Sequence, residues 1–224
     1  MHPIRGAQML PDAFIFDLDG TLVDSLDDIT DALNGALAEN HLVTAPADLV
    51  RGWVGDGLRT LCARAAPGVD SARLERVVRS AESHYKRAVV VKTREYPNIL
   101  KMLDLLQSRG ARMAVLSNKP HALTMEVVHR LKLDHFFTVV QGATSEETRK
   151  PSPLSALTIS HGWGCDPSDV FFVGDSLIDI ATATHSGMVS VAVSWGFVPR
   201  EKLLAAGPNF LVDDPLQVPL LEKK

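Results

Sequence analysis

The stretch Phe14-Ile-Phe-Asp-Leu-Asp-Gly-Thr-Leu-Val-Asp-Ser25 decides the fold of this chain. An apolar run that favours a β-strand, residues 13–16, leads directly into Asp17 and Asp19. Two carboxylates at the end of a buried strand are costly, because each loses water beside a like charge. A metal cation between them, or a reaction that uses both, would offset that cost. Gly20 then allows a tight turn close to a ligand, although Asp and Gly are also the ordinary residues of an acidic turn.

The composition is that of an ordinary globular protein, with 46% hydrophobic and 22% charged residues in a chain of 224. The formal net charge is −4 and the basic residues are dispersed, which argues against nucleic acid as the main partner. Residues 1–11 contain no apolar stretch of signal-peptide length, and no apolar run approaches the roughly 18–20 residues that span a bilayer. We therefore expect a cytoplasmic protein with no membrane partner. The oligomeric state, monomer or dimer, stays open.

Beyond the opening stretch, short apolar runs and helical patterns alternate along the chain. Strands that alternate with helices imply a parallel sheet covered on both faces. The runs predict strands over residues 112–117, 136–141, 170–174, 189–193 and 210–212, with helices over 98–109, 121–131, 154–162 and 178–186.

Residues 25–92, the helical insertion, differ from the rest because helical patterns fill them almost completely. The predicted fold class is therefore α/β, with a Rossmann-like three-layer core around a parallel sheet and an inserted all-helical cap domain. Residues 1–24 and 93–224 are expected to form the core. The helices of the insertion are predicted over residues 25–40, 46–53, 58–66 and 71–90.

Polar residues follow three of the predicted strands. In parallel α/β sheets, ligands bind beyond the carboxyl ends of the strands, so these residues are expected to meet on one edge. They are Asp17 and Asp19 after the first strand, Ser117, Asn118 and Lys119 after the second, and Asp175 with Asp179 after a later one, and a loop adds Lys150.

This set of residues suits phosphoryl transfer. Asp17, Asp19 and Asp175 offer the hard oxygen ligands that Mg²⁺ prefers. Ser117 and Lys150 would bind the oxygens of a phosphoryl group, because charge stabilisation is most of what its transfer needs. One carboxylate can act as a nucleophile, while a second protonates the leaving alkoxide and then activates water.

Four motifs together resemble the haloacid dehalogenase superfamily, and within it the phosphatases of the phosphoglycolate phosphatase type. They are Asp17-Leu-Asp-Gly-Thr-Leu-Val-Asp24, Ser117-Asn118, Lys150-Pro151 and Gly174-Asp-Ser-Leu-Ile-Asp179. The similarity extends over nearly the whole chain. Dehalogenases of the superfamily lack an acid at the position of Asp19, so the resemblance favours a phosphatase.

The resemblance implies that Asp17 is the nucleophile and Asp19 the general acid and base. It also implies Mg²⁺ as the cofactor, bound by the Asp17 carboxylate, the Asp19 backbone carbonyl and Asp175, with Asp179 in support. The phosphoryl group would be bound by Ser117, Asn118 and Lys150, and Gly20 and Thr21 would support the first motif.

The helical insertion matches the cap that follows the first motif in this superfamily. Its stretch Trp53-Val-Gly-Asp-Gly-Leu-Arg59 resembles the loop that closes over the active site of phosphoglycolate phosphatases. Gly57 permits a sharp turn there, and Arg59 could bind a substrate carboxylate with its two-pronged guanidinium or could lie in solvent. Lys119 could bind the far end of the substrate or form a surface salt bridge.

The expected function is Mg²⁺-dependent hydrolysis of a small phosphomonoester, with 2-phosphoglycolate as the leading substrate. The same chemistry would also serve a sugar phosphate, a nucleotide or a pyrophosphate. Phosphotransfer within a sugar, as in β-phosphoglucomutase-like members, is a second alternative. A binding module that keeps the fold without catalysis is a third, and it conflicts with the complete set of motifs.

Overall fold

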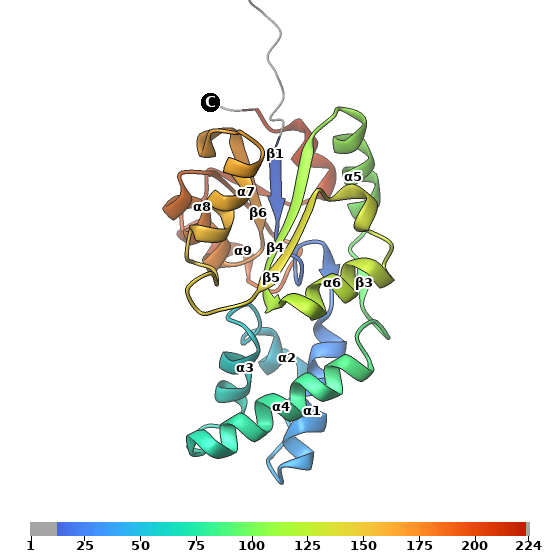
Figure 1. The fold of residues 1–224 in the computed structure, drawn as a ribbon, viewed down its shortest axis with the longest axis vertical. Coiled ribbons are helices and arrows are strands. Elements are labelled where there is room, and N and C mark those ends of the chain that lie inside the picture. Colours follow the sequence, from blue (N-terminus) through green and yellow to red (C-terminus); the bar gives the residue numbers. More distant parts are fainter. Residues whose placement is uncertain (1–12, 223–224) are drawn as a thin grey trace, which may run out of the picture.

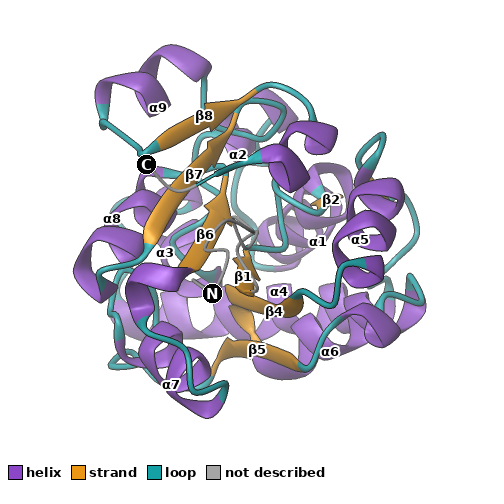
Figure 2. Cartoon of the chain, turned by 90° about the horizontal axis from the view of Figure 1, so that it is seen from above, coloured by secondary structure: helices purple, strands orange, loops and turns teal. Residues whose placement is uncertain are grey.

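The chain folds around a parallel sheet in the order β5-β4-β1-β6-β7-β8, seen in a computed structural model that describes residues 13–222 (Figure 1). Figure 2 shows helices on both faces of this sheet, which confirms the predicted α/β fold with a three-layer core. The strands are β1 (Ala13–Phe16), β4 (Arg112–Pro120), β5 (Val139–Ala143), β6 (Val170–Gly174), β7 (Val189–Val193) and β8 (Phe210–Val212).

Strand β1 is completely buried because it lies between β4 and β6 and both of its faces are covered. Successive side chains of a strand point to opposite faces. Phe14 and Phe16 therefore join one apolar cluster, and Ala13 and Ile15 join another. This arrangement explains why the strand is an unbroken apolar run instead of an alternating one.

Helices cover the two faces in separate sets. The cluster around Phe14 includes α5 (Ile99–Ser108) and α6 (His121–Arg130), whereas the cluster around Ile15 includes α7 (Leu154–Gly162) and α8 (Leu177–Ser186). A short helix, α9 (Arg200–Ala205), packs through Leu203 against Ile180 of α8. The remaining turns are the 3₁₀ helices η1 (Asp134–Phe136), η2 (Pro167–Asp169) and η3 (Pro215–Leu220).

The helical insertion contains α1 (Leu26–Glu39), α2 (Ala47–Arg51), α3 (Leu58–Ala65) and α4 (Ser71–Arg87). Figure 1 shows these helices beyond one end of the sheet, with α1 and α4 side by side. The chain enters the insertion through β2 (Val23–Asp24) and leaves it through β3 (Arg94–Glu95), which pair as an antiparallel ribbon. The division into core and cap domains stays a prediction, and residues 1–12 lie outside the described part of the chain.

Some elements differ from their predicted bounds. The expected strand over residues 136–141 starts later, at Val139, because η1 buries Phe136 from a turn. Strand β4 continues to Pro120 through buried polar residues, and the last helix of the insertion ends at Arg87. The ribbon and α9 were not predicted, since two-residue strands and a six-residue helix are too short to show a period. No helix within residues 13–222 combines the length and apolar character that a bilayer crossing needs.

Candidate active site

The strand register explains why residues from three segments meet at one edge of the sheet. Phe16 of β1 pairs with Val115 of β4 and with Val173 of β6. Asp17 follows Phe16 directly, and its backbone N–H donates to the Val173 carbonyl over 2.9 Å. Ser117 and Asp175 each lie two residues beyond the paired positions. The parallel alignment therefore places all three at the carboxyl ends of adjacent strands, where ligands bind in such sheets.

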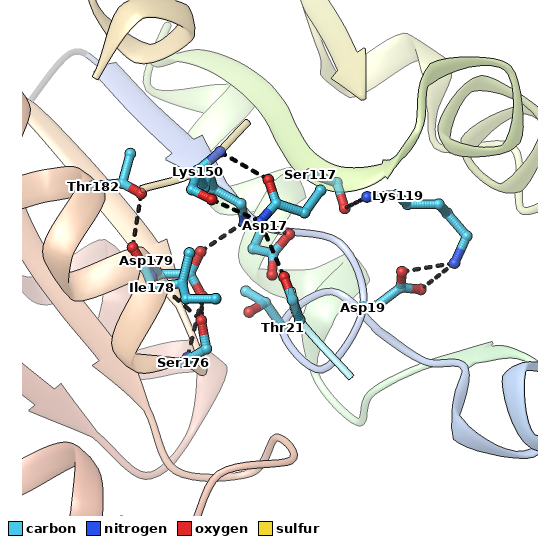
Figure 3. Close-up of polar contacts among 12 residues, drawn as sticks. Asp17, Asp19, Thr21, Ser117, Lys119, Lys150, Ser176, Ile178, Asp179 and Thr182 are labelled. Atoms are coloured by element: carbon cyan, nitrogen blue, oxygen red, sulfur yellow. Dashed lines mark hydrogen bonds and ion pairs between the residues drawn. The ribbon is translucent and has the colours of Figure 1, made fainter. Parts of the chain in front are cut away.

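Three buried carboxylates converge at this edge. Single oxygens of Asp17, Asp175 and Asp179 lie within 4.8 Å of one another. The ammonium of Lys150 forms ion pairs with two of them, 2.8 Å from Asp17 Oδ1 and 2.7 Å from Asp179 Oδ1 (Figure 3). One ammonium thus faces three acids in a site shielded from water.

The pKa values of these groups reflect the excess of acids over cations. Burial raises the pKa of Asp17 to about 7, and although Lys150 counteracts this, the Asp179 carboxylate adds to the rise. Burial also raises the pKa of Asp175 well above its usual range, with Asp179 and Asp17 contributing. Burial alone would lower the pKa of Lys150, but Asp17 and Asp179 outweigh it and raise that pKa. A hard divalent cation would favour the charged carboxylates, so the donor set fits Mg²⁺.

Asp175 is fixed by two glycines and by the loop after β7. Its Oδ2 accepts a hydrogen bond of 2.6 Å from the Phe197 backbone N–H, and its Oδ1 accepts one of 3.3 Å from the Thr21 hydroxyl. A Cβ atom added to Gly20 or to Gly196 would collide with the Asp175 side chain. Gly196 was not predicted as a site residue, and its position in the loop just after the end of β7 at Val193 was the available signal.

Asp179 connects Lys150 to the start of α8. Its Oδ2 accepts hydrogen bonds from the backbone N–H and hydroxyl of Ser176, while the Ser176 hydroxyl accepts from the Asp179 N–H. This capping box fixes the first turn of the helix. The other oxygen of Asp179 remains directed at Lys150. Asp179 therefore positions the lysine as well as contributing to the acid cluster.

Asn118 bridges two loops at the site. Its side-chain oxygen accepts from the Lys150 backbone N–H over 2.8 Å, and its amide donates to the carbonyls of Lys150 and Gly55, each over 3.0 Å. The side chain thus holds Lys150 and the loop of the insertion in place. Ser117 is buried close by and lines the same cavity as Asp17.

Asp19 lies apart from the acid cluster. Both of its carboxylate oxygens contact the Lys119 ammonium, at 2.7 and 2.6 Å, and the Ser25 hydroxyl donates to one of them over 2.6 Å. Figure 3 shows Asp19 and Lys119 on one side of Asp17, with Lys150 and Asp179 on the other. The Lys119 side chain is 6% exposed, so this is a buried ion pair and not a surface salt bridge.

A cavity of about 70 Å³ separates the sheet edge from the helical insertion. Core residues Asp17, Asp19, Ser117 and Lys119 line one side, and apolar residues of α1, α3 and α4 line the other. Gly57 has a φ of +87°, which favours glycine, and it also borders the cavity. Arg59 does not line it.

The side chain of Arg59 is 45% exposed and pairs with Glu75. It borders an adjoining outer groove of about 370 Å³, together with Arg149. Of the residues predicted to contact substrate, the structure therefore brings Gly57 and Lys119 to the cavity and leaves Arg59 outside.

Comparison with known proteins identifies the family. A sequence model described as "Haloacid dehalogenase-like hydrolase" matches residues 14–193. The chain belongs to this family. It is 33% identical over 211 residues to a phosphoglycolate phosphatase of Haemophilus influenzae (strain 86-028NP), with 91% of this chain and 94% of the relative covered. It is 34% identical over 218 residues to one of Pseudomonas syringae pv. tomato, covering 93% and 78% respectively.

A solved structure supports the same family assignment. The crystal structure of "a predicted phosphoglycolate phosphatase" from Haemophilus somnus 129pt matches with a TM-score of 0.88 and 28% identity, covering 95% of this chain and 98% of that one. The resemblance to haloacid dehalogenase phosphatases is thus confirmed, as is the predicted enzyme class, a phosphoric monoester hydrolase. The roles of individual residues in this family member stay predictions.

Proposed function

We propose that this chain is a Mg²⁺-dependent phosphatase that hydrolyses 2-phosphoglycolate through an aspartyl-phosphate on Asp17. The observation that carries the proposal is the position of Asp17, which lies in a buried acid cluster, touches Lys150 and lines the cavity under the helical insertion. A nucleophilic carboxylate needs this combination of a nearby cation and exclusion of water. The relatives named phosphoglycolate phosphatase support the choice of substrate.

The reaction has two steps. In the first, a carboxylate oxygen of Asp17 forms a bond to phosphorus while the bond from phosphorus to the substrate oxygen breaks, and Asp19 gives its proton to the departing alkoxide. In the second, Asp19 takes a proton from water, which attacks phosphorus and releases Asp17 and inorganic phosphate. Asp19 borders the same cavity as Asp17 and reaches these roles after its contact with Lys119 opens.

The other residues stabilise charge and hold the nucleophile in place. Lys150 and Ser117 neutralise and orient the phosphoryl oxygens, while Asp179 holds Lys150. The Asp17 and Asp175 carboxylates and the Asp19 backbone carbonyl would hold Mg²⁺, with Asp179 in support. When bound, Mg²⁺ supplies positive charge to the phosphoryl oxygens. A cytoplasmic location and a small-molecule substrate, with no nucleic acid or membrane partner, belong to the same proposal.

Phosphate release from a panel of small phosphomonoesters, with and without Mg²⁺, tests the proposal. We expect strong preference for 2-phosphoglycolate and loss of release after Mg²⁺ removal. The Asp17→Asn variant should lose turnover by about 10⁴-fold or more, because a neutral amide cannot attack phosphorus. Its thermal unfolding temperature should not fall, since a buried charge of raised pKa has been removed. Substantial turnover by the purified variant would remove Asp17 as the nucleophile, and a flat substrate profile would remove phosphoglycolate.

A further inference from the structure

The side chain of Lys119 lines the same cavity as Asp17. Among the described residues that line this cavity, the charged ones are Asp17, Asp19 and Lys119, so Lys119 is its one cation. Most of the remaining wall is apolar and comes from the helical insertion. A substrate anion beyond the phosphoryl group would lose its water here and needs a charged partner to offset that loss.

The ammonium of Lys119 already binds a carboxylate with both oxygens. Its contacts to Asp19 are 2.7 and 2.6 Å, and both side chains are nearly buried. This geometry is what a substrate carboxylate would use. Asp19 therefore occupies the position of a ligand at Lys119 while it is kept away from the proton transfers proposed for it.

Tyr85 of α4 supplies a second, independent observation. The residue is 4% exposed, and its buried hydroxyl has the Lys119 ammonium as a neighbouring donor but no hydrogen-bond acceptor. The Lys119 ammonium lies over the ring, 4.6 Å from its centroid, but an ammonium has no lone pair to accept the hydroxyl proton. Burial raises the pKa of Tyr85, so the hydroxyl keeps its proton at neutral pH. A buried donor without an acceptor is uncommon, and this one borders the cavity.

We propose that Lys119 and Tyr85 form the binding site for the carboxylate of the substrate, and that this carboxylate displaces Asp19 from Lys119. The ammonium exchanges one carboxylate for another, and the Tyr85 hydroxyl gains the acceptor it lacks. Asp19, released, becomes available to the leaving oxygen. The proposal rests on the phosphatase function above and deepens it, because a phosphomonoester without a carboxylate would leave Asp19 paired with Lys119.

The site joins two parts of the molecule. Lys119 lies at the end of β4, whereas Tyr85 lies in the helical insertion. Recognition of the carboxylate would therefore need the insertion docked on the core. Arg59, which pairs with Glu75 outside the cavity, has no part in it.

The test compares 2-phosphoglycolate with carbamoylmethyl phosphate, its neutral amide of the same shape, in wild type and in Lys119→Met and Tyr85→Phe. We expect kcat/KM to favour the acid in wild type. Lys119→Met should reduce that preference about 100-fold, because only the acid loses a charged partner for its carboxylate. Tyr85→Phe should reduce the preference roughly tenfold. Lys86→Met, an exposed lysine of α4 paired with Glu82, is the matched control and should leave the preference unchanged.

An equal loss on both substrates in Lys119→Met would overturn the proposal, because Lys119 would then only position Asp19. Binding provides a readout that does not depend on turnover. In an Asp17→Asn background, 2-phosphoglycolate should raise the unfolding temperature more than the amide does, and adding Lys119→Met should remove that difference. An unchanged difference would overturn the carboxylate site even in an enzyme that proves active on other phosphomonoesters. Absence of phosphate release from every substrate would instead defeat the proposed function.

Discussion

Asp175 shows how closely single residues constrain this site. Its carboxylate is held by the Phe197 N–H and the Thr21 hydroxyl, and Gly20 and Gly196 approach it so closely that neither has room for a Cβ. The Trp195 indole N–H donates to the Thr21 carbonyl over 2.9 Å and fastens the loop after β7 to the first motif. The acid is therefore positioned by backbone that belongs to two distant segments.

Gly196→Ala tests that constraint. The new methyl group would push against the Asp175 side chain, so we expect a loss of about 1–3 kcal/mol in the free energy of unfolding, the usual effect of overpacking. Phosphate release should fall at least tenfold, because the carboxylate is displaced. Urea denaturation and a steady-state assay measure both effects. The matched control is Gly162→Ala at the end of α7, where an added Cβ meets nothing within 4 Å. Equal behaviour of the two variants would contradict the role given to Gly196.

The sequence predicted the acids at the strand ends because the order of apolar runs already defines a parallel sheet, and parallel strands bring their carboxyl ends together. Asp17, Ser117 and Asp175 could be placed in this way, with Asp179 one helical turn further on, whereas Lys150 lies in a loop and was placed by the motif it belongs to. The partner of Asp19 could not, because Lys119 lies 100 positions away in the chain and either residue could have faced solvent. The need for glycine at position 196 could not be predicted either. It arises because the Asp175 side chain and the Gly20 backbone lie where a Cβ would be, and this depends on how distant loops pack.

At the scale of elements, α1 is tied to the segment that leaves the helical insertion. Asp28 of α1 accepts hydrogen bonds from the backbone N–H groups of Val91, Lys92 and Thr93 and from the Thr93 hydroxyl, over 2.6–3.1 Å. These bonds hold the segment that leaves the insertion against α1, just before β3 begins. Burial would raise the pKa of Asp28, but the bonds from Thr93, Val91 and Lys92 outweigh it and lower that pKa.

The lowered pKa of Asp28 determines how the free energy of unfolding depends on pH. An acid whose pKa is lower in the folded than in the unfolded protein stabilises the fold above its unfolded pKa of about 4. That contribution is lost as pH falls through the lower, folded value. Asp28→Asn should therefore cost about 1–3 kcal/mol at pH 7, and its difference from wild type should shrink as pH falls below about 4. Urea denaturation at several pH values measures this. Asp31→Asn, exposed on the same helix, is the control, and a cost independent of pH would contradict the argument.

At the scale of the whole molecule, two contacts dock the insertion loop on the core. The Asn118 amide donates to the Gly55 carbonyl over 3.0 Å, and the Arg149 guanidinium donates to the Asp56 carbonyl over 3.1 Å. Asn118 also holds Lys150, so its substitution would disturb the site itself. Arg149 borders only the outer groove and can be changed without touching the acid cluster. A substitution of Arg149 therefore tests the contact between the insertion loop and the core separately from the chemistry of the site.

Arg149→Met should shift the molecule toward an undocked arrangement and raise KM for 2-phosphoglycolate. The observed affinity falls in proportion to the fraction of molecules ready to bind, so a loss of about 1.4 kcal/mol in docking would raise KM up to about tenfold. The chemical step uses other residues, and kcat should change less than KM. Limited proteolysis of the loop around Gly55 should become faster in the free enzyme and should be slowed by substrate. Arg130→Met, on an exposed face of α6 with Glu126 as its partner, provides the comparison. A variant that loses kcat at constant KM would place Arg149 in the chemistry instead of in docking.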